Sequence, residues 1–148
     1  MMPPCRDGRS YPGSGVGRLP ENIMHTKINW FEIPSSDFSR ATKFYETLFD
    51  IRLKVEPSGP VQMAIFPDAS GQGVGCVIHG AGMEPGSNGP VIYLDSPAPI
   101  EQVLARVASA GGTVRIEKTE LPDGIGFIAH FIDSEGNRLA LHQPPGKV

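Results

Sequence analysis

One order of elements occurs twice along this chain: strand, helix, strand, strand, strand. Runs of aromatic and β-branched residues indicate the strands, and apolar residues spaced three and four apart indicate amphipathic helices. In the first half these patterns predict strands at 28–33, 52–55, 61–66 and 74–79 and a helix at 39–49. In the second half they predict strands at 91–94, 113–116, 126–132 and 138–142 and a helix at 100–110. Two copies of one five-element unit indicate a duplication rather than a longer repeat array.

The two copies can be aligned with one another. Trp30 matches Val91 near the first strands, and His79 matches His142 at the ends of the closing strands. A single unit has too few strands to bury one face of its sheet, so two units must pack together. We therefore expect an α+β fold in which two βαβββ modules form a half-barrel, with the helices outside and a central cup inside.

The repeat also defines the domain limits. Module one covers 27–80 and module two covers 90–143, within a single domain at 25–144. Residues 1–24 are rich in Pro and Gly and have almost no apolar periodicity, which predicts a flexible tail. Residues 145–148 form a short C-terminal tail. A Gly/Pro/Asn-rich segment at 80–90 links the modules.

Composition argues against several classes of protein. The 148 residues carry a formal charge of −3 and contain no cluster of Lys and Arg, so no nucleic-acid partner is expected. No apolar run approaches the roughly 20 residues that cross a bilayer, and no signal-peptide pattern opens the chain, so no membrane partner and a cytoplasmic location are expected. Cys5 and Cys76 do not make a disulfide framework; one is expected to be a loose thiol and the other a buried apolar residue.

Two motifs carry a family resemblance. Residues 30–34 (WFEIP), followed by Asp37 and by Phe44-Tyr45, resemble the opening of glyoxalase and bleomycin-resistance proteins, the vicinal oxygen chelate superfamily. Residues 131–139 resemble the F-x-D-P-x-G-N ending of the same family, with Ser134 in place of the usual proline. The resemblance covers about 27–143, and it implies paired βαβββ modules that usually assemble as homodimers.

The resemblance also implies where a metal would bind. Enzymes of this superfamily typically hold one divalent ion with side chains from the first and the closing strand of each module, and the ion acts as a Lewis acid. Those positions fall on Trp30, Val77, Val91 and Ala140. None of these side chains ligates a hard divalent ion, so no metal site of the usual kind is expected. A divalent metal held elsewhere remains an alternative.

Alternation along the strands predicts which residues line the cup. If the four family positions face inward, residues two apart from them share that face. The predicted ligand cup consists of Trp30, Glu32, His79, Tyr93, Arg138 and His142. These side chains could bind a polar ligand or serve in acid–base chemistry, but no catalytic residue is assigned.

Each of these residues also has a structural explanation. His79 and His142 could lie at the rim in water, Glu32 could pair with Arg138, and Trp30 and Tyr93 could fill volume. His130 is more typical of a partnered or exposed strand residue than of a ligand, and His25 has no predicted partner. His79, His142 and Glu32 together would have the composition of a non-haem iron centre, an alternative that requires a shifted site.

Three kinds of function fit these features. The first is a metal-independent small-molecule binding protein of the superfamily, with catalytic activity unproven. The second is a metal-dependent lyase, isomerase or dioxygenase. The third is a dimeric interaction module in which the cup is residual. The substituted metal positions favour the first and third, and the polar residues of the cup favour the first.

Overall fold

The computed structural model describes residues 27–147, so the expected tail at 1–24, Cys5 and His25 lie outside the described residues. The elements, in chain order, are β1 (Phe31–Pro34), α1 (Phe38–Phe49), β2 (Lys54–Ser58), β3 (Val61–Ile65), β4 (Gly75–His79), β5 (Ile92–Asp95), α2 (Ile100–Ala110), β6 (Thr113–Leu121), a 3-10 turn η1 (Pro122–Gly124), β7 (Gly126–Ile132) and β8 (Arg138–Gln143). The repeated order is confirmed, and α2 has the predicted bounds. β6 runs past the predicted end at 116, because its polar second half pairs with β7 as an exposed edge strand.

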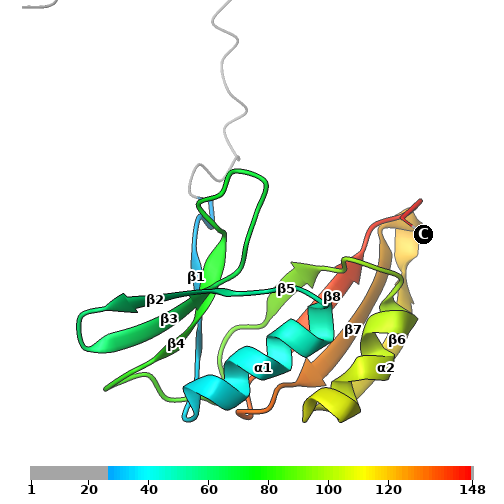
Figure 1. Ribbon diagram of the computed structural model, residues 1–148. Helices are drawn as coiled ribbons and strands as arrows, with labels where there is room; N and C mark the ends of the chain where they lie inside the picture. Colours follow the sequence, from blue (N-terminus) through cyan, green and yellow to red (C-terminus); the bar gives the residue numbers. More distant parts are fainter. Residues whose placement is uncertain (1–26, 148) are drawn as a thin grey trace, which may run out of the picture.

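Each module forms its own four-stranded mixed sheet (Figure 1). The strand order is β1-β4-β3-β2 in sheet 1 and β5-β8-β7-β6 in sheet 2. In both sheets the first strand runs parallel to the closing strand, and the other pairs are antiparallel. The expected α+β class with two βαβββ modules is therefore confirmed.

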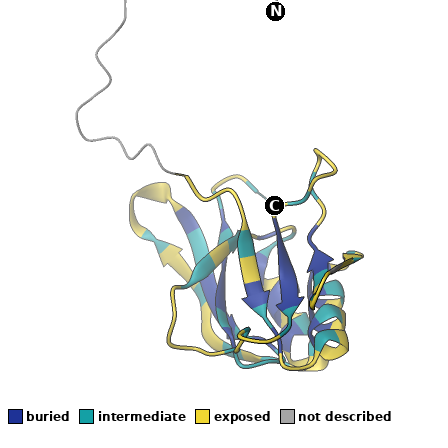
Figure 2. Cartoon of the chain, turned by 90° about the vertical axis from the view of Figure 1, so that its left-hand side faces the viewer, coloured by how far each residue is buried: buried dark blue, intermediate teal, exposed yellow. Residues whose placement is uncertain are grey.

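The two modules share one apolar core. α1 and α2 lie against each other (Figure 1), and the buried residues of both helices join one cluster with residues of both sheets. Phe44 of α1 contacts Phe131 of β7, with ring centroids 6.1 Å apart. Figure 2 shows buried residues along the inner strands and exposed residues at the edges and in the loops. Burying one such side chain contributes about 2 kcal/mol to the free energy of folding. Because residues of both modules are buried in one cluster, this core couples the stability of the two modules.

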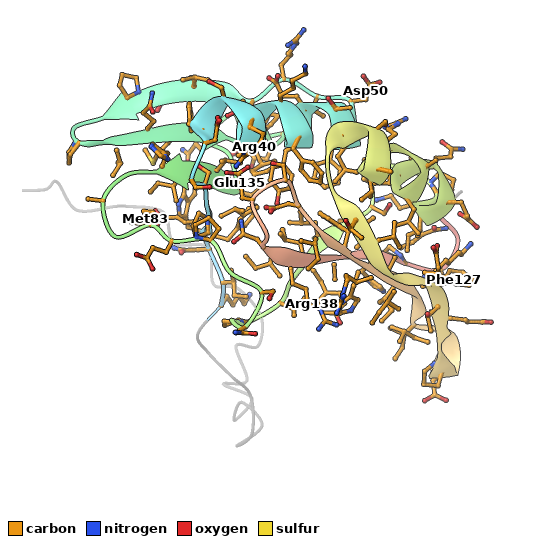
Figure 3. All side chains as sticks on the ribbon, turned by 90° about the horizontal axis from the view of Figure 1, so that it is seen from below. Arg40, Asp50, Met83, Phe127, Glu135 and Arg138 are labelled. Atoms are coloured by element: carbon orange, nitrogen blue, oxygen red, sulfur yellow. The ribbon has the colours of Figure 1, made fainter. Side chains whose placement is uncertain are left out.

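A carboxylate of module two binds the segment that leads into the helix of module one. Glu135, in the turn between β7 and β8, accepts hydrogen bonds from the backbone N–H groups of Ser36 (3.0 Å) and Asp37 (2.8 Å). Arg40 of α1 pairs with the same carboxylate at 2.8 Å (Figure 3). Burial alone would raise the pKa of Glu135, but the hydrogen bonds from Arg40, Asp37 and Ser134 outweigh it and hold the pKa at about 2.

Other residues of the same turn make a further contact with α1 and hold two more parts of the chain. The hydroxyl of Tyr45 in α1 donates to Asp133 Oδ2 at 2.6 Å. Asn137 donates from Nδ2 to the carbonyl of Pro34 at 2.8 Å, and its Oδ1 accepts from the N–H of Gly86 at 3.0 Å. The turn between β7 and β8 therefore fixes α1, the end of β1 and the linker in one place.

Each sheet has one face against the helices and one face turned away from them, here called the helix-distal face. In sheet 2, Tyr93 pairs with Ala140, and Ala140 pairs with His130, so these three share the helix-distal face. Alternation along β8 places Arg138 and His142 on the same face. This is the register that the sequence predicted for module two.

Module one differs from the sequence prediction by one residue. Glu32 pairs with Cys76, and Ile33 pairs with Val77. Val77 therefore lies in the core with Ile33, and His79 shares its side of the sheet, whereas the prediction placed both with Glu32. The prediction was wrong because β4 is buried along both faces, so its apolar run carries no alternation that fixes the register.

Candidate functional site

A polar network lies on the helix-distal face of sheet 2. Tyr93 on β5 and His130 on β7 lie on either side of Ala140 on β8. Because Ala140 carries only a methyl group, the two larger side chains meet above it. Tyr93 Oη lies 2.9 Å from His130 Nε2, and the rings pack edge to face with centroids 5.3 Å apart.

Arg138 determines how this network is protonated. Its Nε–H donates to His130 Nδ1 at 3.2 Å. An arginine N–H can only donate, so Nδ1 accepts and the imidazole proton lies on Nε2. Burial, followed by the charge of Arg138, lowers the pKa of His130 and keeps the imidazole neutral. His130 then donates to Tyr93 Oη, which leaves the hydroxyl proton of Tyr93 available to a ligand.

Tyr93 and His142 line a hollow of about 390 Å³ at one end of this face. The other lining residues are Asp95, Leu121, Ile125 and Ile128. His142 Nε2 lies 2.9 Å from the carbonyl oxygen of Ile125, so the imidazole is held at the edge of the hollow. Its lining combines the apolar residues Leu121, Ile125 and Ile128 with Tyr93, Asp95 and His142.

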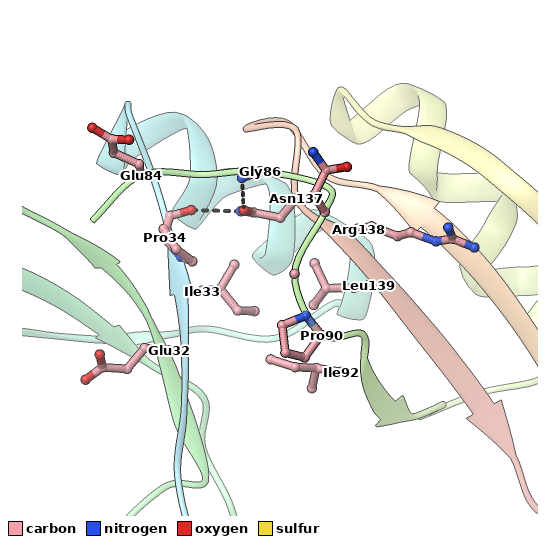
Figure 4. A pocket seen from close by; sticks show the side chains of 12 residues that line it. Glu32, Ile33, Pro34, Glu84, Gly86, Pro90, Ile92, Asn137, Arg138 and Leu139 are labelled. Atoms are coloured by element: carbon pink, nitrogen blue, oxygen red, sulfur yellow. Dashed lines mark hydrogen bonds between the residues drawn. The ribbon is translucent and has the colours of Figure 1, made fainter. Parts of the chain in front are cut away.

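A second hollow, of about 440 Å³, lies between the modules beneath the linker (Figure 4). Its apolar part is made by Ile33, Pro90, Ile92 and Leu139. Glu32 and Arg138 also line it, but Figure 4 shows their side chains extending to opposite sides. No ion pair joins them within residues 27–147, so the alternative of a Glu32–Arg138 pair is not supported.

The structure brings together only part of the predicted cup. Tyr93, Arg138 and His142 share the helix-distal face of sheet 2, as expected. Glu32 is on β1, and Trp30, which precedes it, is 37% exposed. His79 lies on the helix side of sheet 1, where its Nδ1 is 2.8 Å from the carbonyl oxygen of Ser35.

The alternative iron centre is therefore not assembled. Glu32 and His79 point to opposite faces of sheet 1, and His142 belongs to sheet 2. Within residues 27–147, no group of three or more His, Cys, Asp or Glu side chains is placed to hold a metal ion.

The metal positions implied by the family also fail a residue-by-residue test. With the observed register, the closing-strand position of module one is Cys76 instead of Val77, because Cys76 is the partner of Glu32 as Ala140 is the partner of Tyr93. Burial, and then the charge of Glu32, raises the pKa of Cys76 to about 11, which keeps the thiol protonated. Trp30, Val91 and Ala140 offer no donor for a divalent ion.

Sequence reasoning missed two residues of this face. It treated His130 as an ordinary strand residue, although Ile128, His130 and Ile132 alternate toward the face of Tyr93. The small residue Ala140 between their strands was the available signal. It also overlooked Arg115, which lines a hollow with Arg138. No pattern in the sequence marks the bulge in which Arg115 lies.

This geometry defines a duplicated βαβββ protein with a polar network on one sheet and hollows beside it. The sequence model described as the glyoxalase/bleomycin resistance protein/dioxygenase superfamily matches residues 27–141. The chain belongs to this superfamily. It is similar to a glyoxylase-like domain-containing protein from Didymella fabae, with 26% identity over 135 residues that cover 84% of this chain and 99% of that protein.

Solved structures show the same fold. One is a glyoxalase/bleomycin resistance protein from Albidiferax ferrireducens T118, with 17% identity and a TM-score of 0.58 over 79% of this chain and 98% of that one. Another is TnmS3, an antibiotic binding protein from Streptomyces sp. CB03234, with 22% identity and a TM-score of 0.57 over 82% of this chain and 98% of that one.

No helix among the described residues is long and apolar enough to cross a membrane.

Proposed function

We propose that this protein binds a small molecule on the helix-distal face of sheet 2, without the divalent metal of the superfamily enzymes. The observation that carries the proposal is the Tyr93–His130–Arg138 network, in which hydrogen bonds fix the tautomer of a buried histidine. The network leaves a hydroxyl donor and a guanidinium directed at the surface of the sheet. Such preset polar groups beside apolar walls are typical of ligand sites.

The size of the hollows supports the same proposal. Hollows of about 390 and 440 Å³ adjoin the network, and ligand pockets commonly enclose roughly 300–1,000 Å³. The similarity to an antibiotic binding protein of the same fold agrees with a small organic ligand. The substituted metal positions at Trp30, Cys76, Val91 and Ala140 favour binding over metal-dependent lyase, isomerase or dioxygenase chemistry.

A ligand panel tests the proposal. Compounds that bind the folded protein raise its melting temperature, and a ligand at 100 times its dissociation constant adds about 2.7 kcal/mol of stability. We expect His130→Gln to weaken the hits about tenfold, since it breaks the network. His79→Gln is the matched control, because His79 lies on the helix side of the other sheet. Equal affinities of both variants for every hit would overturn the assignment of the site.

Metal analysis tests the proposal that binding does not require a divalent metal. The untagged protein is incubated with Fe, Mn, Ni and Zn, passed through a desalting column and measured by elemental analysis. We expect less than stoichiometric metal. One tightly held ion per chain would contradict metal-independent binding and favour the enzyme alternative.

The proposal includes the homodimer and the cytoplasmic location expected from the sequence. Sedimentation of the purified chain tests the first, and fractionation of the source cells tests the second. A monomer at all concentrations would remove the dimer from the proposal and leave the Tyr93–His130–Arg138 site unchanged, since module two supplies all three residues.

A further inference from the structure

A third hollow, of about 340 Å³, lies on the helix-distal face of sheet 2 next to the linker. Its lining residues are Ser87 and Asn88 of the linker, Arg115 of β6, Ile132 of β7, Gly136 of the turn, and Arg138 of β8. Two of these six residues are arginines and none is acidic. This is a local concentration of positive charge on a chain whose net charge is −3.

Arg115 lies in a β-bulge of β6 and lines this hollow. Val114 pairs with Phe131 and Ile116 pairs with His130, which are consecutive residues, so Arg115 is an extra residue without a partner on β7. Thr113 pairs with Ile132 on the helix-distal face, so alternation from Thr113 places Arg115 on that face, and the bulge leaves Arg115 without a ladder partner. Arg115 therefore shares the helix-distal face with Arg138 and lines the same hollow.

Both arginines retain unused hydrogen-bond donors. The ion pairs among residues 27–147 join Arg40, Arg52, Lys54, Lys118 and Lys147 to carboxylates, and neither Arg115 nor Arg138 takes part in one. Within the described residues, the side chain of Arg138 uses only its Nε, toward His130. Its two terminal amino groups stay available, and the hydrogen bond to His130 holds the guanidinium in one orientation.

We propose that this hollow binds an oxyanion, the carboxylate or phosphate of a small molecule, between Arg115 and Arg138. The planar guanidinium suits both groups because it can donate two parallel hydrogen bonds to them. This inference rests on the proposed function and adds the charge class of its ligand.

The position of Arg138 also indicates the rest of the ligand. Arg138 and Asn88 line both this hollow and the larger hollow between the modules. The apolar lining of the larger hollow includes Ile33, Ile92 and Leu139, and Glu32 and Glu84 line it as well. A ligand that fills both therefore has an acidic head at the two arginines and an apolar body between the modules.

Nuclear magnetic resonance of the arginine side chains tests the proposal on the intact chain. The probes are benzoate, phenyl phosphate and the neutral benzamide, titrated while the Nε–H resonances of Arg115 and Arg138 are followed. We expect both resonances to move with benzoate or phenyl phosphate, and benzamide to bind at least tenfold more weakly. The two anions distinguish a carboxylate site from a phosphate site.

Substitutions at Arg115 complete the test. We expect Arg115→Gln to raise the dissociation constant of the better anion about tenfold, and Arg115→Lys to raise it less, because lysine keeps the charge and loses the planar fork. Arg52→Gln is the matched control, since the Arg52 side chain is 91% exposed and lies in module one.

The two levels of the proposal fail in different ways. If benzamide binds as well as benzoate and Arg115→Gln has no effect, the oxyanion site is overturned while small-molecule binding stands. If neither anion moves the arginine resonances, the oxyanion site is likewise overturned. If, in addition, no compound of the wider panel binds, the proposed function is overturned as well.

Discussion

The two modules share one architecture but differ on their helix-distal faces. In module one, Ile65, Cys76 and Ile78 form a buried apolar cluster, packed against Met63 and Met83 among others. In module two, the corresponding face carries Tyr93, His130, Arg138 and His142. Cys76 and Ala140 occupy equivalent places, the first among apolar side chains and the second beneath a tyrosine–histidine contact.

This difference indicates which faces of the two modules are constrained and which are not. The faces against the helices must fit one shared core, which constrains both copies in the same way. The helix-distal faces carry no such constraint, and they differ: the buried part of the module-one face is apolar, whereas the module-two face carries the Tyr93–His130–Arg138 network. We therefore expect ligand recognition in module two. The following substitutions test this difference between the modules, beginning with the core that both share.

The largest expected effect comes from opening the shared core. Phe131→Ala removes a fully buried ring that contacts α1 of the other module, and we expect a loss of about 4 kcal/mol in the free energy of unfolding. Urea unfolding followed by Trp30 fluorescence reports on module one, and circular dichroism reports on both modules. The two transitions should shift together. Separate transitions would show that the modules unfold independently.

Ile125→Ala is the control for this experiment. Ile125 is also an apolar residue of module two, but it is 51% exposed. We expect a change of at most about 0.5 kcal/mol.

The contact between the modules at Glu135 should have the next largest effect. Glu135→Gln removes a carboxylate that accepts from Arg40 and from two backbone N–H groups, at a cost of about 2 kcal/mol. The folded pKa of about 2 is below the ordinary glutamate value of 4.5, so this stabilisation is present above pH 4.5 and is lost as the pH falls toward 2.

Acid titration of the unfolding free energy checks this prediction. The free energy of unfolding of Glu135→Gln should fall less steeply between pH 4.5 and 2 than that of the parent protein. Glu117→Gln, at an exposed position of β6, is the control, and its free energy of unfolding should fall as steeply as that of the parent protein. An unchanged acid profile in Glu135→Gln would contradict the assigned pKa.

Serine substitutions at the two equivalent positions compare the faces directly. Cys76→Ser places a hydroxyl in an apolar cluster and is expected to cost about 2 kcal/mol. Ala140→Ser places the same group beside Tyr93 and His130, where it finds a hydrogen-bond partner, and should cost about 1 kcal/mol less. Chemical denaturation of both variants gives the difference. Equal costs would mean that the two faces do not differ in polarity as described.

The smallest effect concerns the pH dependence of the network. The pKa of His130 is lowered by burial and by Arg138, so the unfolded chain takes up a proton more readily than the folded one. Stability contributed by the neutral imidazole is therefore present above about pH 6.5 and declines as the pH falls below it. Thermal unfolding of His130→Gln should show a flatter profile between pH 7 and 5 than the parent protein. A steeper profile would contradict the predicted direction.

The fold could be predicted from the sequence, and so could the face of module two that carries part of the candidate site. The helix spacing of α1 and α2 and the turn residues between elements are local signals, and the structure agrees with them. On β8, Arg138 and His142 alternate with buried leucines, so the face of module two could be predicted. On β4, four consecutive buried residues offer no such contrast, and the register was predicted one residue out.

Two features of the site depend on distant parts of the chain. The contact of Tyr93 with His130 exists because Ala140 is small, and it joins strands that are not neighbours in the sheet. Arg115 lines one hollow with Arg138 because β6, β7 and β8 lie side by side in sheet 2. Neither cause is visible in a window of a few residues.

The residues that carry the family signature contact one another. Asp37 and Tyr45 come from the opening motif, Asp133 and Asn137 come from the closing one, and all four lie at the junction between α1 and the turn after β7. In this chain the signature residues therefore have a structural role, because they join the two modules of the duplicated scaffold. In this chain they account for the architecture, whereas the residues that we propose to bind a ligand lie on the helix-distal face.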